Sequence, residues 1–121
     1  GSVIDHTALA AIRALQRSGQ PDLVVRVMAS YLETTPDILD RIRSAAQSQN
    51  APELRAAAHR LKSCSAQLGA LAVSADCREL ELMGERRDLT SVDELVGRLE
   101  QHYAAACLAL RSEVTKGRVA A

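Results

Sequence analysis

Apolar and small side chains recur every three or four residues in four long segments of this 121-residue chain. Such spacing places them along one side of an α-helix. No segment shows the alternation of apolar and polar residues that is typical of a strand. The links between the segments are short, so consecutive helices are expected to run antiparallel. The sequence therefore predicts an all-α protein, an antiparallel four-helix bundle with a short additional N-terminal helix that covers one end.

Capping residues and prolines predict the limits of the helices. Asp5 is expected to cap the short first helix, and residues 18–21 to end it and start the next one. The second helix is expected over about 22–48, kinked but unbroken at Pro36, because the apolar spacing passes through the proline without a shift of phase. The other helices are expected over about 51–68, from 71 to the segment 85–88, and from 91 to about 116.

The composition limits which residues can form the core and which classes of protein the chain can belong to. Apolar residues make up 47% of the chain, but Phe and Trp are absent and only two Tyr occur, so the core must be aliphatic and rich in Ala. Lys and Arg (15) balance Asp and Glu (15), which argues against binding to nucleic acid or to a membrane surface. No apolar run approaches the ~20 residues of a membrane span. A cytoplasmic protein with buried, reduced cysteines is expected, a reactive thiol being the alternative.

The chain is long enough for one domain, expected over residues 3–116. Gly1 and Ser2 have the composition of a cloning scar. Residues 117–121 are expected to form a flexible tail.

His59 lies on the side of its helix opposite the apolar residues. At about 100° per residue it stands roughly 140° from the apolar centre. Arg55 and Lys62 share a flank of the same helix. The small residues within two turns of the histidine are Ala56, Ser63 and Ala66. We therefore expect an exposed imidazole among small side chains, where a catalytic partner can reach it.

Glu81 is expected to support that imidazole from the next helix. The helices on either side of the turn at residues 69–70 should pack antiparallel. His59 and Glu81 each lie eleven residues from Ala70, on flanks that face the same side. Glu81 would then accept a hydrogen bond from Nδ1–H of His59 and leave Nε2 free. The alternatives are a solvated Glu81 or an ion pair with Arg55.

Phosphoryl transfer suits these residues better than other chemistries. A neutral imidazole is a competent nucleophile near neutral pH, and Lys62 could place an ammonium beside a phosphoryl group. The three histidines lie far apart and lack partners at metal-ligand spacing, so no metal site is expected. No glycine-rich phosphate loop and no oxyanion hole are apparent. From spacing alone, a surface histidine on a helical bundle remains the alternative.

The motif around His59 also resembles that of a known family. The residues that carry the resemblance are His59-Arg60-Leu61-Lys62, Ser65, Leu68-Gly69-Ala70 and Cys77-Arg78-Glu79-Leu80-Glu81. They are similar to the histidine-containing phosphotransfer (HPt) domain of multistep phosphorelays, and the resemblance extends from about Ile4 to about Ser112. The family commonly has Gly directly after the lysine, whereas this chain has Ser63.

The resemblance implies a phosphocarrier rather than a complete enzyme. His59 would accept a phosphoryl group from a receiver-domain aspartate and pass it to a response-regulator aspartate, with Lys62 stabilising the phosphate and Glu81 orienting the ring. The receiver would bring the Mg²⁺, so the domain needs no cofactor and no ATP site of its own. The expected docking residues are Arg55, Ala56, Ser63 and Ala66.

Two questions stay open at the level of the sequence. A helical interaction or dimerisation module that binds receivers without carrying phosphate is the alternative function. The domain is expected to be a monomer, either as a stand-alone protein or as the terminal domain of a hybrid sensor histidine kinase.

Overall fold

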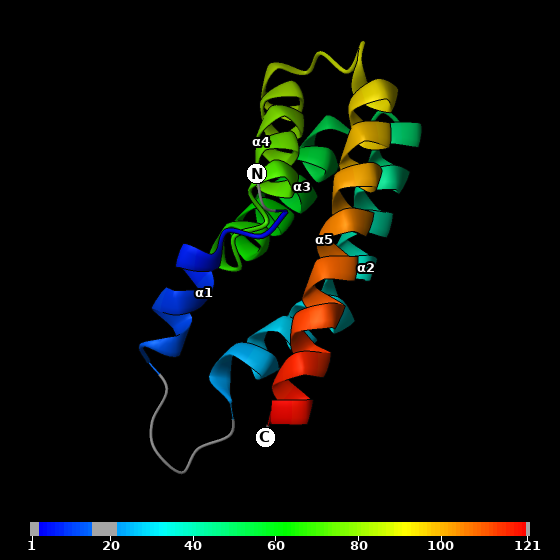
Figure 1. Cartoon of the computed structure of the whole chain (residues 1–121). Coiled ribbons are helices and arrows are strands. Elements are labelled where there is room, and N and C mark those ends of the chain that lie inside the picture. The colour runs from blue at the N-terminus through cyan, green and yellow to red at the C-terminus, as the bar shows by residue number, and fades with distance from the viewer. Residues whose placement is uncertain (1–2, 16–21, 121) are drawn as a thin grey trace.

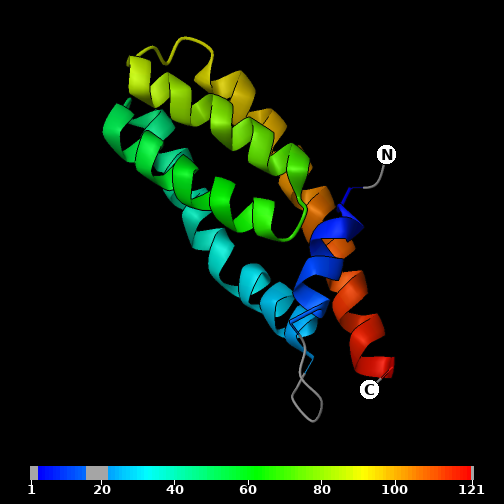
Figure 2. The same cartoon turned by 90° about the vertical axis from the view of Figure 1, so that its left-hand side faces the viewer.

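The computed structural model describes residues 3–15 and 22–120, and within them every element is an α-helix. Helices α2 to α5 form the predicted antiparallel bundle, and α1 lies against the N-terminal part of α2 (Figure 1). Helices α2 and α5 extend beyond the turn between α3 and α4, and α1 lies beside this extension (Figure 2). The bounds are α1 His6–Arg13, α2 Leu23–Gln47, α3 Ala51–Gln67, α4 Leu71–Arg86 and α5 Val92–Ala120.

Polar side chains cap the helices where the sequence predicts. The side chain of Asp5 accepts a hydrogen bond from the backbone of Thr7, and Asn50 caps α3 in the same way through Glu53 N–H, 3.1 Å away. Each bond satisfies a backbone donor that the first turn of a helix leaves free. Helix α2 continues through Pro36 without a break, as predicted.

Gly69 closes α3 and joins it to the N-terminal segment. Its φ of +76° favours glycine, and a Cβ at this position would lie 2.5 Å from the backbone oxygen of Asp5. The backbone N–H of Asp5 in turn donates to the Gly69 carbonyl over 2.8 Å. The turn that follows the His59 helix is therefore fixed by a residue near the start of the chain.

Two boundaries differ from those that the sequence predicts. Helix α1 ends at Arg13, so Leu15 falls in a turn and is 70% exposed instead of continuing the apolar side. Helix α5 continues to Ala120, beyond the predicted end near residue 116. A single glycine costs a helix only about 1 kcal/mol, so Gly117 does not by itself stop it. The segments 1–2 and 18–21 lie outside the described residues.

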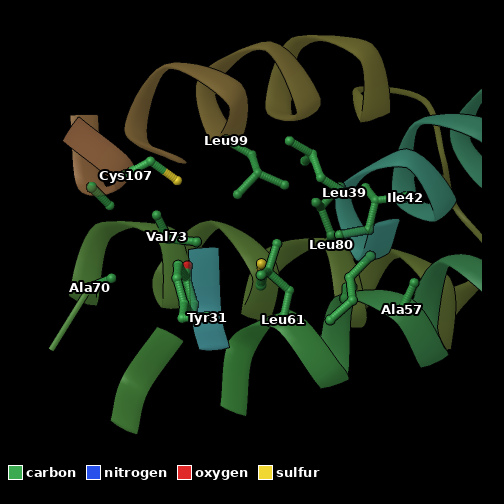
Figure 3. Close-up of a cluster of buried hydrophobic side chains, with 14 of the residues drawn as sticks. Tyr31, Leu39, Ile42, Ala57, Leu61, Ala70, Val73, Leu80, Leu99 and Cys107 are labelled. Atoms are coloured by element: carbon green, nitrogen blue, oxygen red, sulfur yellow. The ribbon is translucent and has the colours of Figure 1, made fainter. Parts of the chain in front are cut away.

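The core is aliphatic and includes Tyr31 (Figure 3), while Tyr103 is partly buried against it. Tyr31 is hydrogen-bonded to Ser65 at 2.8 Å, and Tyr103 to Thr35 at 2.7 Å, so the buried hydroxyls have partners. Cys77 and Cys107 are buried and free, and burial raises the pKa of Cys77 to about 12. Among the described residues, no helix is both long and apolar enough to cross a membrane.

Candidate functional site

The candidate site is built on the solvent-facing side of α3. His59 projects from the middle of this helix, and 64% of its side chain is exposed. The opposite side is fixed in the core by residues such as Leu54 and Leu61, which are fully buried. The imidazole therefore stands on a rigid helix and is open to solvent, as predicted.

Glu81 of α4 makes the predicted contact with the ring. Its Oε2 lies 2.6 Å from Nδ1 of His59, and its side chain is only 17% exposed. With an ionised carboxylate, Nδ1 carries the proton and donates it, so Nε2 keeps its lone pair and is the nitrogen available for reaction. The carboxylate also stabilises any positive charge that develops on the ring.

The close approach of α4 to α3 at Gly84 brings Glu81 within reach. A Cβ at Gly84 would lie 2.7 Å from the backbone oxygen of Ala51 and 3.0 Å from the backbone nitrogen of Arg55. Backbone atoms cannot yield as a flexible side chain can. Gly84 thus sets the spacing between the two helices one turn beyond Glu81.

Lys62 lies at the site, but its ammonium is bound to Glu81. Its Nζ is 2.9 Å from Oε1 and 3.2 Å from Oε2 of the carboxylate, and the lysine side chain is 23% exposed. Glu81 therefore holds His59 and Lys62 together. The sequence predicts an ammonium near the ring but not that Lys62 and His59 share one carboxylate.

These contacts change the acidity of Glu81. Partial burial works to raise its pKa, but the hydrogen bonds from Lys62 and His59 outweigh it and lower the pKa below the ordinary 4.5. The carboxylate is therefore ionised throughout the neutral range.

The small residues predicted around His59 are exposed on α3. Ala56, Ser63 and Ala66 leave the approach to the ring open. The Ser63 hydroxyl donates to the His59 carbonyl at 3.2 Å, so it lies along its own helix rather than beside the imidazole. Serine in place of the family's glycine thus adds little bulk at the ring.

Arg55 does not pair with Glu81, so that alternative is wrong. Its guanidinium lies 3.3 Å from Glu85, one turn further along α4, and the arginine side chain is 57% exposed. Arg55 remains at the edge of the surface that includes His59. In the described parts of the chain, no three His, Cys, Asp or Glu side chains are arranged to hold a metal ion.

A second histidine–carboxylate pair, which sequence reasoning missed, lies between α4 and α5. Nδ1 of His102 is 2.5 Å from Oδ2 of Asp76, and Nε of Arg98 is 3.2 Å from Oδ1 of the same residue. Asp76 is buried, and Arg98 also donates to Glu79. Two features of the sequence could have pointed to this pair. Asp76 directly precedes a core position of α4, and His102 follows Arg98 by four residues on α5.

The comparisons with known proteins identify the family and a similar fold. The Hpt domain family model matches residues 26–112, so the chain belongs to the Hpt domain family and is an intermediate in phosphoryl relay. The fold is similar to the crystal structure of histidine-containing phosphotransfer protein B (HptB) from Pseudomonas aeruginosa PAO1. That match has a TM-score of 0.87 and 22% identity, and it covers 96% of this chain and 97% of the other. No curated protein matches the chain in sequence.

Proposed function

We propose that His59 is the residue that carries the phosphoryl group. Nε2 attacks the phosphorus of a receiver's aspartyl phosphate, the P–O bond to the aspartate breaks, and the carboxylate leaves. The reverse reaction on a second receiver passes the group on. The observation that carries the proposal is the exposed ring whose Nδ1 is held 2.6 Å from Glu81.

Glu81 acts as a positioning residue and Lys62 as the cation that stabilises the phosphate. Once Nε2 is phosphorylated, the ring is positively charged and the carboxylate opposes that charge. Lys62 Nζ, bound to the same carboxylate, is on the ring's side of the helix pair and can turn toward the phosphoryl oxygens. One carboxylate thereby serves both groups.

The receiver would dock on α3 around His59, at Arg55, Ala56, Ser63 and Ala66. The side chains of the last three are short, so a receiver can bring its aspartate close to the ring. Arg55 at the edge would attract the acidic surroundings of the aspartate. The receiver supplies the Mg²⁺, and the domain itself uses no cofactor and has no kinase activity.

We further propose that the domain works as a cytoplasmic monomer, whether alone or joined to a sensor kinase. Receivers are its partners in either case, since the family acts between receiver aspartates.

The test is transfer from a phosphorylated receiver to the wild type and to His59→Gln. The wild type should gain an acid-labile label, and His59→Gln should gain none while keeping its helicity and its affinity for the receiver. His102→Gln is the matched control and should be labelled as the wild type is. Full labelling of His59→Gln would overturn the assignment. Receiver binding by an unlabelled wild type would instead favour the interaction module.

A further inference from the structure

The cluster between α4 and α5 repeats the chemistry of the His59 site with other residues. Asp76 is 5% exposed, and its carboxylate receives His102 Nδ1 on one oxygen and Arg98 Nε on the other. In the same way, the carboxylate of Glu81 accepts hydrogen bonds from His59 Nδ1 and Lys62 Nζ. Both imidazoles are thus tied through Nδ1 to a carboxylate of α4 that also binds a cation.

The ring of His102 is accessible, although less so than that of His59. Its side chain is 42% exposed, whereas that of Asp76 is 7% exposed. With Nδ1 engaged, Nε2 is the nitrogen left for reaction. In the direction away from Arg98 and Glu79, the exposed positions one turn along the two helices are occupied by small residues, Ala72 on α4 and Ala105 on α5.

We propose that His102 is a second phosphoryl-accepting histidine, which reacts with small phosphoryl donors. The Nε2 lone pair attacks phosphorus, the bond from phosphorus to the donor's leaving group breaks, and the ring becomes an N-phosphoimidazolium. With phosphoramidate the leaving group is ammonia, which departs with the protons already on its nitrogen. The positive charge left on the ring is opposed by Asp76, and Arg98 can turn to the phosphoryl oxygens.

A small donor fits this site better than a docked protein does. The side chains of Arg98 and Glu79, 52% and 56% exposed, meet in an ion pair beside the ring. The surface is therefore less open than the bare stretch of α3 around His59. Glu79 also adds negative charge, so an anionic donor should react more slowly here than at His59.

The third histidine of the chain is a natural internal control. His6 is exposed at the start of α1 and has no carboxylate partner among the described residues. The three histidines fall in different tryptic peptides, which span residues 1–13, 56–60 and 99–111. One digest therefore measures the phosphorylation of all three sites in the same molecules.

The experiment treats the intact wild-type chain with phosphoramidate and follows the three peptides by mass spectrometry at neutral pH. We expect His102 to react about tenfold faster than His6, the size of effect that one charge-assisted hydrogen bond in the transition state gives. The advantage should disappear in urea, where Asp76 no longer faces the ring. Equal rates for His102 and His6 in the folded protein would overturn the proposal.

Two variants sharpen the result. Asp76→Asn keeps the size of the side chain and an oxygen acceptor but removes the charge, so the rate at His102 should fall toward that at His6. His102→Gln should lose the label on peptide 99–111 alone. An undiminished rate in a folded Asp76→Asn variant would contradict the role of the carboxylate. Transfer from a receiver is measured separately on peptide 56–60, so failure here and failure of the proposed role of His59 are distinguishable.

Discussion

The two histidine–carboxylate pairs of this bundle have the same parts but different surroundings. At His59 the cation Lys62 is 23% exposed and tucked beside Glu81, and the imidazole itself is 64% exposed. Between α4 and α5 the cation is more exposed than the imidazole, because Arg98 is 52% exposed and His102 only 42%. The imidazole of His59 is therefore the more open of the two, which is why we propose receiver docking there and not at His102.

Helix α4 supplies the carboxylate for both pairs. Asp76 and Glu81 are five residues apart, which turns them about 140° from each other around the helix axis. One therefore faces α5 and the other faces α3. The comparison suggests four experiments that change one pair and leave the other intact.

The largest effect is expected from bulk beside His59. Ala66→Trp should slow transfer from a phosphorylated receiver about 100-fold, because a displacement of even 1 Å at the reacting atoms has consequences of this order. The rate is measured from the loss of label on the receiver. Ala105→Trp, the corresponding change one turn from His102, should alter it less than about twofold. Normal transfer by Ala66→Trp would show that the receiver docks elsewhere.

Removal of the more buried carboxylate should have the larger effect on stability. Asp76→Ala removes a buried carboxylate, leaves His102 without its partner and Arg98 with Glu79 alone, and is expected to lower the free energy of unfolding by about 2 kcal/mol. Glu81→Ala should lower it by roughly 1 kcal/mol, because the Glu81 side chain is 17% exposed, against 7% for Asp76, and its hydrogen bonds compete more with water. Urea unfolding followed by circular dichroism measures both. Equal losses would mean that burial does not distinguish the two pairs.

Removal of the Glu81 carboxylate should instead affect transfer. Glu81→Ala is expected to slow phosphoryl transfer to His59 about tenfold, or 1.4 kcal/mol, as for the loss of one charge-assisted hydrogen bond. Reactions with a phosphorylated receiver that are stopped at successive times give the rate of label transfer. Asp76→Asn is the matched control, and its rate should stay close to that of the wild type. An unchanged rate for Glu81→Ala would remove the proposed positioning role.

The smallest expected effect is on the stability of the protein at acid pH. Because the pKa of Glu81 is lowered in the folded protein, its contribution to stability is present above its ordinary value of 4.5 and is lost as the pH falls through the folded value. The difference in unfolding free energy between wild type and Glu81→Gln should therefore shrink between about pH 6 and pH 3. The pKa of Asp88 is also lowered, but Asp88 is present in both proteins, so its contribution cancels in the difference between them. A difference independent of pH would contradict the charge assignment.

Local chemistry and register were sufficient to predict the helices and the central contact of the site. Caps at Asp5 and Asn50 form from the residue and its nearest backbone donors, so neighbours in sequence determine them. The pairing of Glu81 with His59 followed from equal distances to one turn in an antiparallel pair. These features depend on backbone geometry that short segments already specify.

The partners of the long cations could not be predicted in this way. Lys62 and Arg55 have several rotatable bonds, and their choice among Glu81, Glu85 and solvent depends on side chains of another helix. The cluster around Asp76 requires the rotation of α4 against α5, which the longer link between these helices leaves open in sequence. Contacts made by long flexible side chains, and contacts between helices joined by a longer link, thus need coordinates.

The adjacent tyrosines give the protein its own optical reporter. Trp and Phe are absent, and Tyr31 and Tyr103 are the only aromatic residues, with ring centroids 6.3 Å apart. Near-ultraviolet dichroism and intrinsic fluorescence therefore arise from one spot, where α2 meets α5 and Tyr31 is bonded to Ser65 of the His59 helix. A phosphorylation or binding event that shifts α3 would be visible there without any attached dye.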